Sequence, residues 1–537
     1  MTDRLSAREF LALVTDDFTE LPAPARESTP DGPLAWQGYD AARARAAERT
    51  GEDESVVCGT GKVEGTRAVL LAFEFGYLGG SLGVRTGDRL EAAYTYARAH
   101  RLPVVPLVAT GGSRMQEGML ALTQLQRVAR QSALTREAGL PQIAVLRDPT
   151  TGGGWATLGA GADIILALPG AQIGFAGSRV RPPDADPRAY TAEAQVAAGA
   201  VDALVRPESL RETLGHWLHL LTSPAPEAPL PRHPGPEAPS PTANTDARPA
   251  SLPADRKADL APTDDTPQVP EPPHSGTQTP PPADDPQDTP HLTGTGARPG
   301  SSPAGREAVV TSADDTPDTP PADGTQEPPA SPLPHTGWEA VQRARSPQRP
   351  GADSYLDSYF TRRLAISGDR CGGTDPGMLC GFGEHAGRAV AYAAQAGTAT
   401  RPAGYRTAAR LIRLADRLGI PVLTLVDTPG AANDAEAERQ GAGAAIAEVF
   451  GAVASARTPI TTLLIGEGGS GGALALAAPG NTWATPDSYF SVIAPESAAA
   501  ILKRPPEEVE VTADQLRIRP QDLVELGVVR DRTAPSA

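Results

Sequence analysis

Residues 103–112 read PVVPLVATGG and residues 421–430 read PVLTLVDTPG. Forty residues after each, a second apolar run ends in glycines: PQIAVLRDPTTGGGWA (141–156) and PITTLLIGEGGSGGALA (459–475). ALPGAQIGF (167–175) and ATPDSYFSV (484–492) follow, so three matches recur in the same order at offsets of 316 to 319 residues. Self-similarity of this kind indicates that the chain consists of two copies of one unit.

The composition restricts the classes of function. The chain has 537 residues, enough for two or three domains, and a net charge of −17, which argues against non-specific binding to nucleic acid or to anionic membranes. Its three cysteines, Cys58, Cys371 and Cys380, fit neither a disulfide framework nor a CxxC zinc site. No window approaches 18 uninterrupted apolar residues and the N-terminus does not resemble a signal peptide, so a cytoplasmic protein is expected.

A change of composition divides the chain. Residues 223–335 contain 29 of the 56 prolines and almost no aromatic residues, so we expect a disordered linker, acidic and rich in proline, between a domain at 1–222 and a domain at 336–537. In each flanking block, apolar runs alternate with helical patterns. This alternation predicts an α/β fold. The predicted strands are 68–75, 104–109, 422–426 and 460–465, and the predicted helices are 119–139 and 405–419.

The glycine-rich turns carry the chemistry. Each follows a buried strand and precedes a helix, so its backbone N–H groups can bind an oxyanion at the helix N-terminus. Two other interpretations are open. The glycines can serve only to make tight turns, and GEGGSG (466–471) also satisfies the dinucleotide pattern GxGxxG, although a nucleotide-binding unit normally begins its domain. The repeated arrangement of four turns favours the oxyanion interpretation.

Longer strings in both blocks resemble one enzyme family. GGSRMQEG (111–118) and RDPTTGGGWA (147–156) resemble the β subunit of bacterial acetyl-CoA carboxylase carboxyltransferase, whereas GYRTAARLIRLADRLGIPVLTLVDTPGA (404–431) and GEGGSGGALAL (466–476) resemble its α subunit. The chain therefore resembles a β–α fusion of two subunits that are usually separate. The resemblance implies the crotonase fold, a ββα superhelix, in each half.

The resemblance also implies a reaction and its site. Members of this family move CO₂ from carboxybiotin to the α-carbon of an acyl-CoA, acetyl-CoA by default, and negative charge develops on the thioester oxygen and on the biotin ureido oxygen. Two oxyanion holes are then needed, and no side-chain base. Matched to the family, Gly152 and Gly153 face the thioester, Gly471 and Gly472 face biotin, and the neighbouring turns can add a second N–H to each hole. The residues of these neighbouring turns are Gly111, Gly112, Gly430 and Ala431.

Further residues are expected to bind the ligands. Arg85, Arg89 and Arg114 lie in segments that resemble ligand loops, so they are candidates for the CoA phosphates, with surface charge or a structural ion pair as the alternative. Gly468 and Gly469 are assigned to the biotin side. The family's four-cysteine zinc ribbon has no counterpart here, so no zinc is predicted. Glu117 and Asp427 are expected to order their turns rather than to catalyse.

The implied partners are a biotin carboxyl carrier protein and a biotin carboxylase, and a homodimer is expected. Two departures concern the α-like half: Ala432-Asn433-Asp434 replaces the Tyr-Pro-Gly that usually follows DTPGA, and the basic loop before GYR is short. Two alternatives therefore stay open. One is a crotonase-type acyl-CoA decarboxylase or hydratase that uses only the first half, and the other is a catalytically degenerate scaffold of a carboxylase complex.

Overall fold

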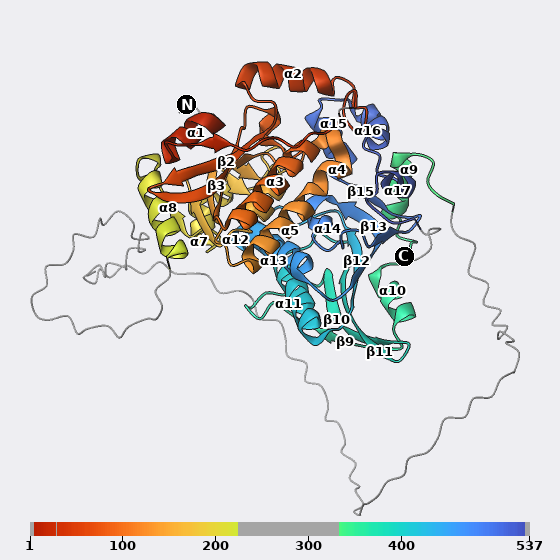
Figure 1. Cartoon of the computed structure of the whole chain (residues 1–537). Coiled ribbons are helices and arrows are strands. Elements are labelled where there is room, and N and C mark those ends of the chain that lie inside the picture. The colour runs from red at the N-terminus through yellow and green to blue at the C-terminus, as the bar shows by residue number, and fades with distance from the viewer. Residues whose placement is uncertain (1–4, 28, 224–331, 532–537) are drawn as a thin grey trace, which may run out of the picture. The chain divides into compact units, whose positions relative to one another are not determined.

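Strands that are buried on both faces form the centre of each half. The computed structural model describes residues 5–27, 29–223 and 332–531. In Figure 1 the strands of the first half, red to yellow, and those of the second half, green to blue, form separate sheets. The predicted strands at 68–75, 104–109, 422–426 and 460–465 are all present. Three begin at the predicted residue, and no end differs by more than four residues.

The sheet of the first half is mixed. Its eight strands run in the order β1-β2-β3-β4-β5-β6-β8, and β7 pairs with β5. The pairs β1·β2 and β2·β3 are antiparallel, and the others are parallel. The strands are β1 (Thr19–Glu20), β2 (Val56–Val63), β3 (Thr66–Phe73), β4 (Val104–Thr110), β5 (Ile143–Thr151), β6 (Ile164–Ala167), β7 (Ile173–Gly174) and β8 (Ala203–Leu204).

The sheet of the second half repeats this plan. Its seven strands run in the order β14-β13-β12-β11-β10-β9, and β15 pairs with β13. Again the first two pairings, β9·β10 and β10·β11, are antiparallel and the others parallel. The strands are β9 (Arg362–Ile366), β10 (Met378–His385), β11 (Arg388–Gln395), β12 (Val422–Thr428), β13 (Ile460–Gly469), β14 (Thr482–Ala484) and β15 (Tyr489–Ser491).

Helices connect the parallel strands. The first half contains α1 (Ala7–Val14), α2 (Tyr39–Thr50), α3 (Val84–His100), α4 (Gly118–Leu122), α5 (Gln124–Glu137), α6 (Gly152–Gly154), α7 (Ala192–Ala197) and α8 (Pro207–Thr222). The second half contains α9 (Gly337–Ala344), α10 (Ala352–Tyr359), α11 (Pro402–Leu418), α12 (Ala435–Arg439), α13 (Ala442–Ser455), α14 (Ser470–Leu474), α15 (Pro495–Ile501), α16 (Val509–Gln515) and α17 (Pro520–Glu525). The short helical turns used below are η1 (Leu78–Gly80), η2 (Met115–Glu117), η3 (Trp155–Gly159) and η4 (Pro187–Tyr190).

The predicted helix at 119–139 is divided in two. α4 ends at Leu122 and α5 begins at Gln124, with Thr123 between them. α5 then ends at Glu137. Gly139 follows with a φ of +70°, a conformation that costs free energy for any residue with a side chain. The second predicted helix is present as α11, and its apolar stripe is buried against the sheet.

The two halves share a core. α5 of the first half lies against α13 of the second (Figure 1), and one apolar cluster includes Leu125 and Trp155 together with Ala445 and Phe450. The described residues of both halves belong to one compact unit. The α/β prediction is therefore confirmed. The domain boundaries at 222 and 336 stay a prediction, and residues 224–331 of the predicted linker lie outside the described residues.

Candidate functional site: two glycine turns

The first pair of glycine turns lies where β4 and β5 end. The parallel ladder between these strands shifts register between Val108 and Thr110, and Thr110 then pairs with Thr150. This irregularity brings the two turns together, because a Cβ added to Gly152 would lie 3.2 Å from the Cα of Gly112. Gly152 has a φ of +66°, which favours glycine at this position.

The second pair lies where β12 and β13 end. Here too the ladder shifts register, between Val426 and Thr428, before Thr428 pairs with Gly468. A Cβ added to Gly472 would meet the backbone nitrogen of Ala431 and would lie 2.6 Å from the hydroxyl of Tyr405. The turns after the second and third parallel strands are therefore in contact in both halves.

Matching hydrogen bonds hold the turns that follow β4 and β12. The N–H of Gly112 donates to Oγ1 of Thr110 at 3.0 Å, and the N–H of Gly430 donates to Oγ1 of Thr428 at 3.1 Å. The N–H of Gly111 donates to the carbonyl of Gly79 at 2.9 Å. These three N–H groups therefore have acceptors within the protein, and the role predicted for their turns stays a prediction.

The ladders also give a residue-by-residue correspondence between the halves. Because Thr110 pairs with Thr150 and Thr428 pairs with Gly468, Gly152 corresponds to Ser470. The backbone agrees, since Ser470 has a φ of +54° although it carries a side chain. Gly153 then corresponds to Gly471. The sequence comparison matched Gly152-Gly153 with Gly471-Gly472, whereas the strand pairing matches them with Ser470-Gly471, one residue earlier.

Both turns after β5 and β13 open into a helix without a side-chain cap. The N-cap residues are Thr151, whose side chain makes no hydrogen bond to the helix, and Gly469, which has no side chain. The hydroxyl of Thr151 instead donates to the carbonyl of Thr110 at 3.3 Å. The N–H groups in the first turn of a helix have no intrahelical acceptor, so both turns offer donors to an anion.

One leucine contacts both turns. Leu125, at the start of α5, packs against Gly153, and a Cβ added to Gly471 would lie 3.6 Å from its Cδ1 atom. The ring of Phe175 lies beside it, 3.5 Å from the same added Cβ. The glycine turns of the two halves therefore meet at shared side chains within one chain.

The three candidate arginines differ in exposure. Arg114 is 1% exposed and pairs with Glu54 at 2.5 Å and with Glu117 at 3.4 Å. Arg89 is 7% exposed and donates to the carbonyl of Val56. The structure places both among structural contacts. Arg85 is more accessible, with a side chain that is 36% exposed and 3.5 Å from Asp53.

The glycines assigned to the biotin side and the two ordering carboxylates have packing roles. Gly468 leaves room for the ring of Phe490, and Gly469 lies against the backbone of Pro429. Glu117 accepts the N–H of Val84 at 2.6 Å, so its ordering role is confirmed.

Asp427 also orders its turn. It accepts the N–H of Glu467 at 3.0 Å and pairs with Arg349 at 2.6 Å. Burial raises the pKa of Asp427, although Arg349 acts in the opposite direction. A hydrogen-bonded, ion-paired carboxylate of this kind holds the end of β12 rather than exchanging protons.

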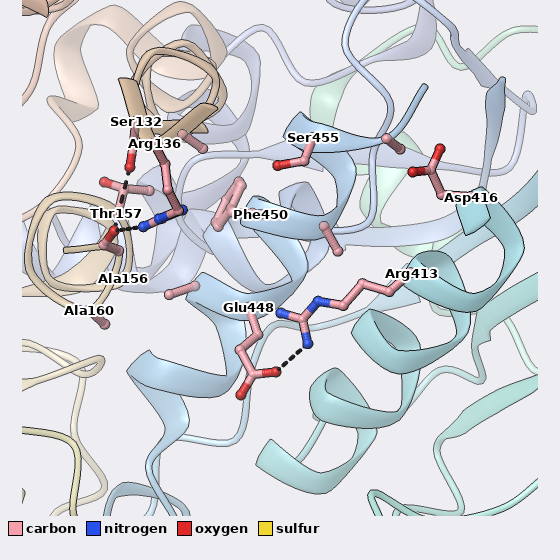
Figure 2. A pocket seen from close by; sticks show the side chains of 16 residues that line it. Ser132, Arg136, Ala156, Thr157, Ala160, Arg413, Asp416, Glu448, Phe450 and Ser455 are labelled. Atoms are coloured by element: carbon pink, nitrogen blue, oxygen red, sulfur yellow. Dashed lines mark hydrogen bonds and ion pairs between the residues drawn. The ribbon is translucent and has the colours of Figure 1, made fainter. Parts of the chain in front are cut away.

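A groove of about 360 Å³ lies between the halves near these turns. Figure 2 shows Ser132, Arg136 and Thr157 of the first half opposite Arg413 and Glu448 of the second. Arg413 pairs with Glu448 at 3.0 Å, and Thr157 donates to the carbonyl of Gly153 at 2.7 Å. None of the predicted site residues lines this groove, so it adjoins the turns without containing them.

Several groups that belong to the site were not predicted. They are Thr110, Thr428, Leu125, Phe175 and Ser470. The two threonines could have been found, because ATGG and DTPG place a threonine before each turn at the same offset. Ser470 is identified by the strand pairing of the second half, and Leu125 and Phe175 by the contact between the halves.

Among residues 5–27, 29–223 and 332–531, no group of three or more His, Cys, Asp or Glu side chains is arranged to hold a metal ion. No helix within those ranges is long and apolar enough to cross a membrane.

Comparison with known proteins decides the family. Residues 334–533 match the model of the "acetyl co-enzyme A carboxylase carboxyltransferase-like" family, and residues 35–203 match the "carboxyl transferase domain". The acetyl-coenzyme A carboxylase carboxyl transferase subunits beta/alpha of Salinispora arenicola are 35% identical, over 98% of this chain and 81% of that protein. The chain belongs to the acetyl-CoA carboxylase carboxyltransferase family. The predicted family and its reaction class, biotin-dependent carboxyl transfer to an acyl-CoA, are thereby confirmed.

Two further relatives agree with this assignment. The corresponding protein of Saccharopolyspora erythraea is 32% identical over 91% of this chain and 73% of its own length. A probable biotin-dependent acyl-coenzyme A carboxylase beta3 subunit of Mycobacterium bovis is 30% identical over 91% of this chain and 81% of its own length. Among solved structures, transcarboxylase 12S matches at 18% identity with a TM-score of 0.35, covering 98% of this chain and 86% of that one.

Proposed function

We propose that this carboxyltransferase takes acetyl-CoA as its acyl-CoA and produces malonyl-CoA, with carboxybiotin arriving on a carrier protein. The observation that carries the proposal is the meeting of the two uncapped glycine turns at Leu125. A carboxyl transfer needs anion stabilisation on both the donor and the acceptor, and two facing sets of N–H donors can provide it.

In this proposal each half has its own task. The N–H groups of Gly152 and Gly153 stabilise the thioester oxygen, and those of Gly471 and Gly472 stabilise the ureido oxygen of biotin. Held amides of this kind stabilise charge without reorganising during the reaction. The matched strand orders, register shifts and threonine contacts support a further proposal, that the halves are duplicated copies of the crotonase fold.

Arg85 is the proposed contact for the CoA phosphates. It is the most exposed of the three candidate arginines, and a guanidinium suits phosphate geometry. Arg89 and Arg114 then act only by holding the loops around it. A biotin carboxyl carrier protein and a biotin carboxylase are the proposed partners, the homodimer is the proposed assembly, and the cytoplasm is the proposed location.

The test is the reverse half-reaction. Malonyl-CoA decarboxylation is measured with and without free biocytin for the wild type, Gly152→Val and Gly471→Val. We expect biocytin-dependent turnover. Each variant keeps its backbone N–H, but the added side chain fills the space beside the turn and displaces its amides, so each should lose about 100-fold or more, the usual effect of losing one oxyanion donor. Gly351→Val is the matched control, because Gly351 has a negative φ and no neighbour within 4 Å of an added Cβ.

The outcomes separate the alternatives. Turnover that does not depend on biocytin, and that only Gly152→Val abolishes, would support the acyl-CoA decarboxylase or hydratase instead. Absence of turnover with intact malonyl-CoA binding would support the degenerate scaffold. Full activity of either glycine variant would remove that turn from the site.

A further inference from the structure

A carboxylate of the second half is buried against the first half. Glu438 lies on α12 and has no exposed surface. Its Oε1 atom accepts the N–H of Ala176 at 3.0 Å, across 262 residues of sequence. Its Oε2 atom is also buried and makes no hydrogen bond of full geometry among the described residues, although the N–H of Phe175 and the side-chain amide of Gln195 lie close enough to stabilise the carboxylate. An ionisable group placed in this way is costly for folding, so its position calls for a role.

The segment that Glu438 holds passes both glycine turns. Segment 174–177 begins at the last residue of β7, and the ring of Phe175 lies 3.5 Å from a Cβ added to Gly471 of the second turn. Two residues later, a Cβ added to Gly177 would lie 3.5 Å from the hydroxyl of Thr151, which precedes the first turn. A Cβ added to Gly174 would lie 3.2 Å from Oε1 of Glu438, so the carboxyl also packs directly on this backbone.

We infer that Glu438 is a positioning residue for carboxyl transfer, which fastens segment 174–177 so that the glycine turns of the two halves keep their spacing. This inference rests on the proposed function of those turns. Glu438 does not touch the reacting atoms. It acts through Ala176 and Phe175.

Other contacts join residues 180–190 of the first half to residues 433–439 of the second. The hydroxyl of Tyr190 donates to the carbonyl of Asn433 at 2.7 Å, and the side-chain amide of Asn433 donates to the carbonyl of Val180 at 2.9 Å. Arg439, at the end of α12, pairs with Asp186 at 2.9 Å. Of these contacts between the halves, only the hydrogen bond to Glu438 involves a carboxylate side chain without exposed surface.

Burial raises the pKa of Glu438 to about 7, although the N–H groups of Ala176 and Phe175 act in the opposite direction. The charged and titratable groups around it are Arg181 and Tyr190 of the first half, and Asp434 and Arg439 at the ends of α12. When the segment opens, the carboxyl becomes solvated and its pKa returns toward 4.5. The closed form therefore holds a proton more tightly, and it loses stability as the pH rises from about 4.5 to about 7.

The experiment compares Glu438→Gln and Glu438→Ala with the control Glu436→Gln, which lies on the same helix with a side chain that is 60% exposed. The glutamine can accept the Ala176 N–H and cannot ionise, whereas the alanine leaves that N–H unpaired. Hydrogen exchange of the Ala176 amide is measured between pH 5 and 8, corrected for intrinsic rates. Biocytin-dependent malonyl-CoA decarboxylation provides kcat and KM.

In the wild type we expect the protection of Ala176 to fall by up to about tenfold per pH unit below 7 and then to level off. Glu438→Gln should abolish this dependence and keep kcat within about threefold of the wild type. Glu438→Ala should lose protection at every pH and lower kcat about tenfold, with KM for malonyl-CoA little changed. Glu436→Gln should behave as the wild type.

Wild-type kcat in Glu438→Ala, or an unchanged pH dependence of exchange in Glu438→Gln, would overturn the inference. If the wild type itself showed no biocytin-dependent turnover, the proposed function would fail. The exchange data would then decide alone whether Glu438 fastens the segment.

Discussion

At the scale of single residues, backbone contact explains why the turns require glycine. Gly471 and Gly472 are adjacent and both buried, but only at Gly472 would an added Cβ overlap neighbouring atoms. Its carbonyl accepts hydrogen bonds from Tyr405 at 3.0 Å and from Gln395 at 3.2 Å, and the space beside its Cα is filled by Ala431. The two positions should therefore respond differently to the same change.

Gly472→Ala is expected to lower the free energy of unfolding by about 1–3 kcal/mol, because the added methyl overpacks the contact with Ala431. Gly471→Ala should change it by less than about 1 kcal/mol, since its added Cβ makes ordinary contacts at 3.5 Å and alanine favours a helix. Urea unfolding of both variants measures the difference. Equal effects at the two positions would show that the turn is not packed as described.

Sequence patterns located both glycine turns but could not align them residue by residue. Glycine runs of different length, GGG at 152–154 and GGSGG at 468–472, allow several offsets. The strand pairing selects one offset, and it places Ser470, rather than a glycine, in the left-handed position. The sequence offers no candidate base for Ser470, so a nucleophile role is not expected; its backbone conformation is the feature that matches the other half.

At the scale of elements, a buried ionic network joins segments that are separate in the sequence. Arg114 precedes η2, Glu54 precedes β2, and Tyr39 begins α2. The hydroxyl of Tyr39 donates to Glu117 at 2.5 Å, and Arg114 pairs with both carboxylates. The sequence offered phosphate binding and a structural ion pair as alternatives for Arg114. Only the tertiary partner, 60 residues away, distinguishes between them.

This network predicts a pH dependence. Burial alone would favour the neutral acid, but Arg114 lowers the pKa of Glu54 to about 2. The pair therefore stabilises the folded state above about pH 4.5, and this contribution is lost as the pH falls toward 2. We expect Glu54→Gln to lower stability at pH 7 by about 3–5 kcal/mol and to flatten the acid limb below pH 4.5.

Chemical unfolding of the wild type and Glu54→Gln between pH 3 and 7 checks this expectation. Glu52→Gln is a suitable comparison, because Glu52 pairs with Arg8, whose side chain is 53% exposed. An acid limb of unchanged slope in Glu54→Gln would contradict the assignment.

At the scale of the whole molecule, the sequence predicted two repeated halves and a homodimer but not how the halves meet. The helical pattern at 119–139 predicts the helix that contains α5 and does not show that α5 packs on α13. The contact depends on shape at one position: Trp155, on η3, is fully buried and fills the space beside the Cα of Gly443 at the start of α13. Its indole nitrogen has no hydrogen-bond partner among the described residues, so packing alone holds the ring there.

Gly443→Val should therefore weaken the packing between the halves more than it destabilises either half. The added side chain would overlap the indole of Trp155. Because the two halves share one apolar cluster, we expect one thermal transition in the wild type and two in Gly443→Val. Calorimetry and tryptophan fluorescence report the transitions. Gly451→Val, on the same helix and with no atom within 4 Å of its added Cβ, is the control and should keep one transition. Since the glycine turns meet only where the halves pack, biocytin-dependent turnover should fall together with the loss of cooperative unfolding. Full activity in a Gly443→Val protein that shows two transitions would mean that the turns do not act together within one chain.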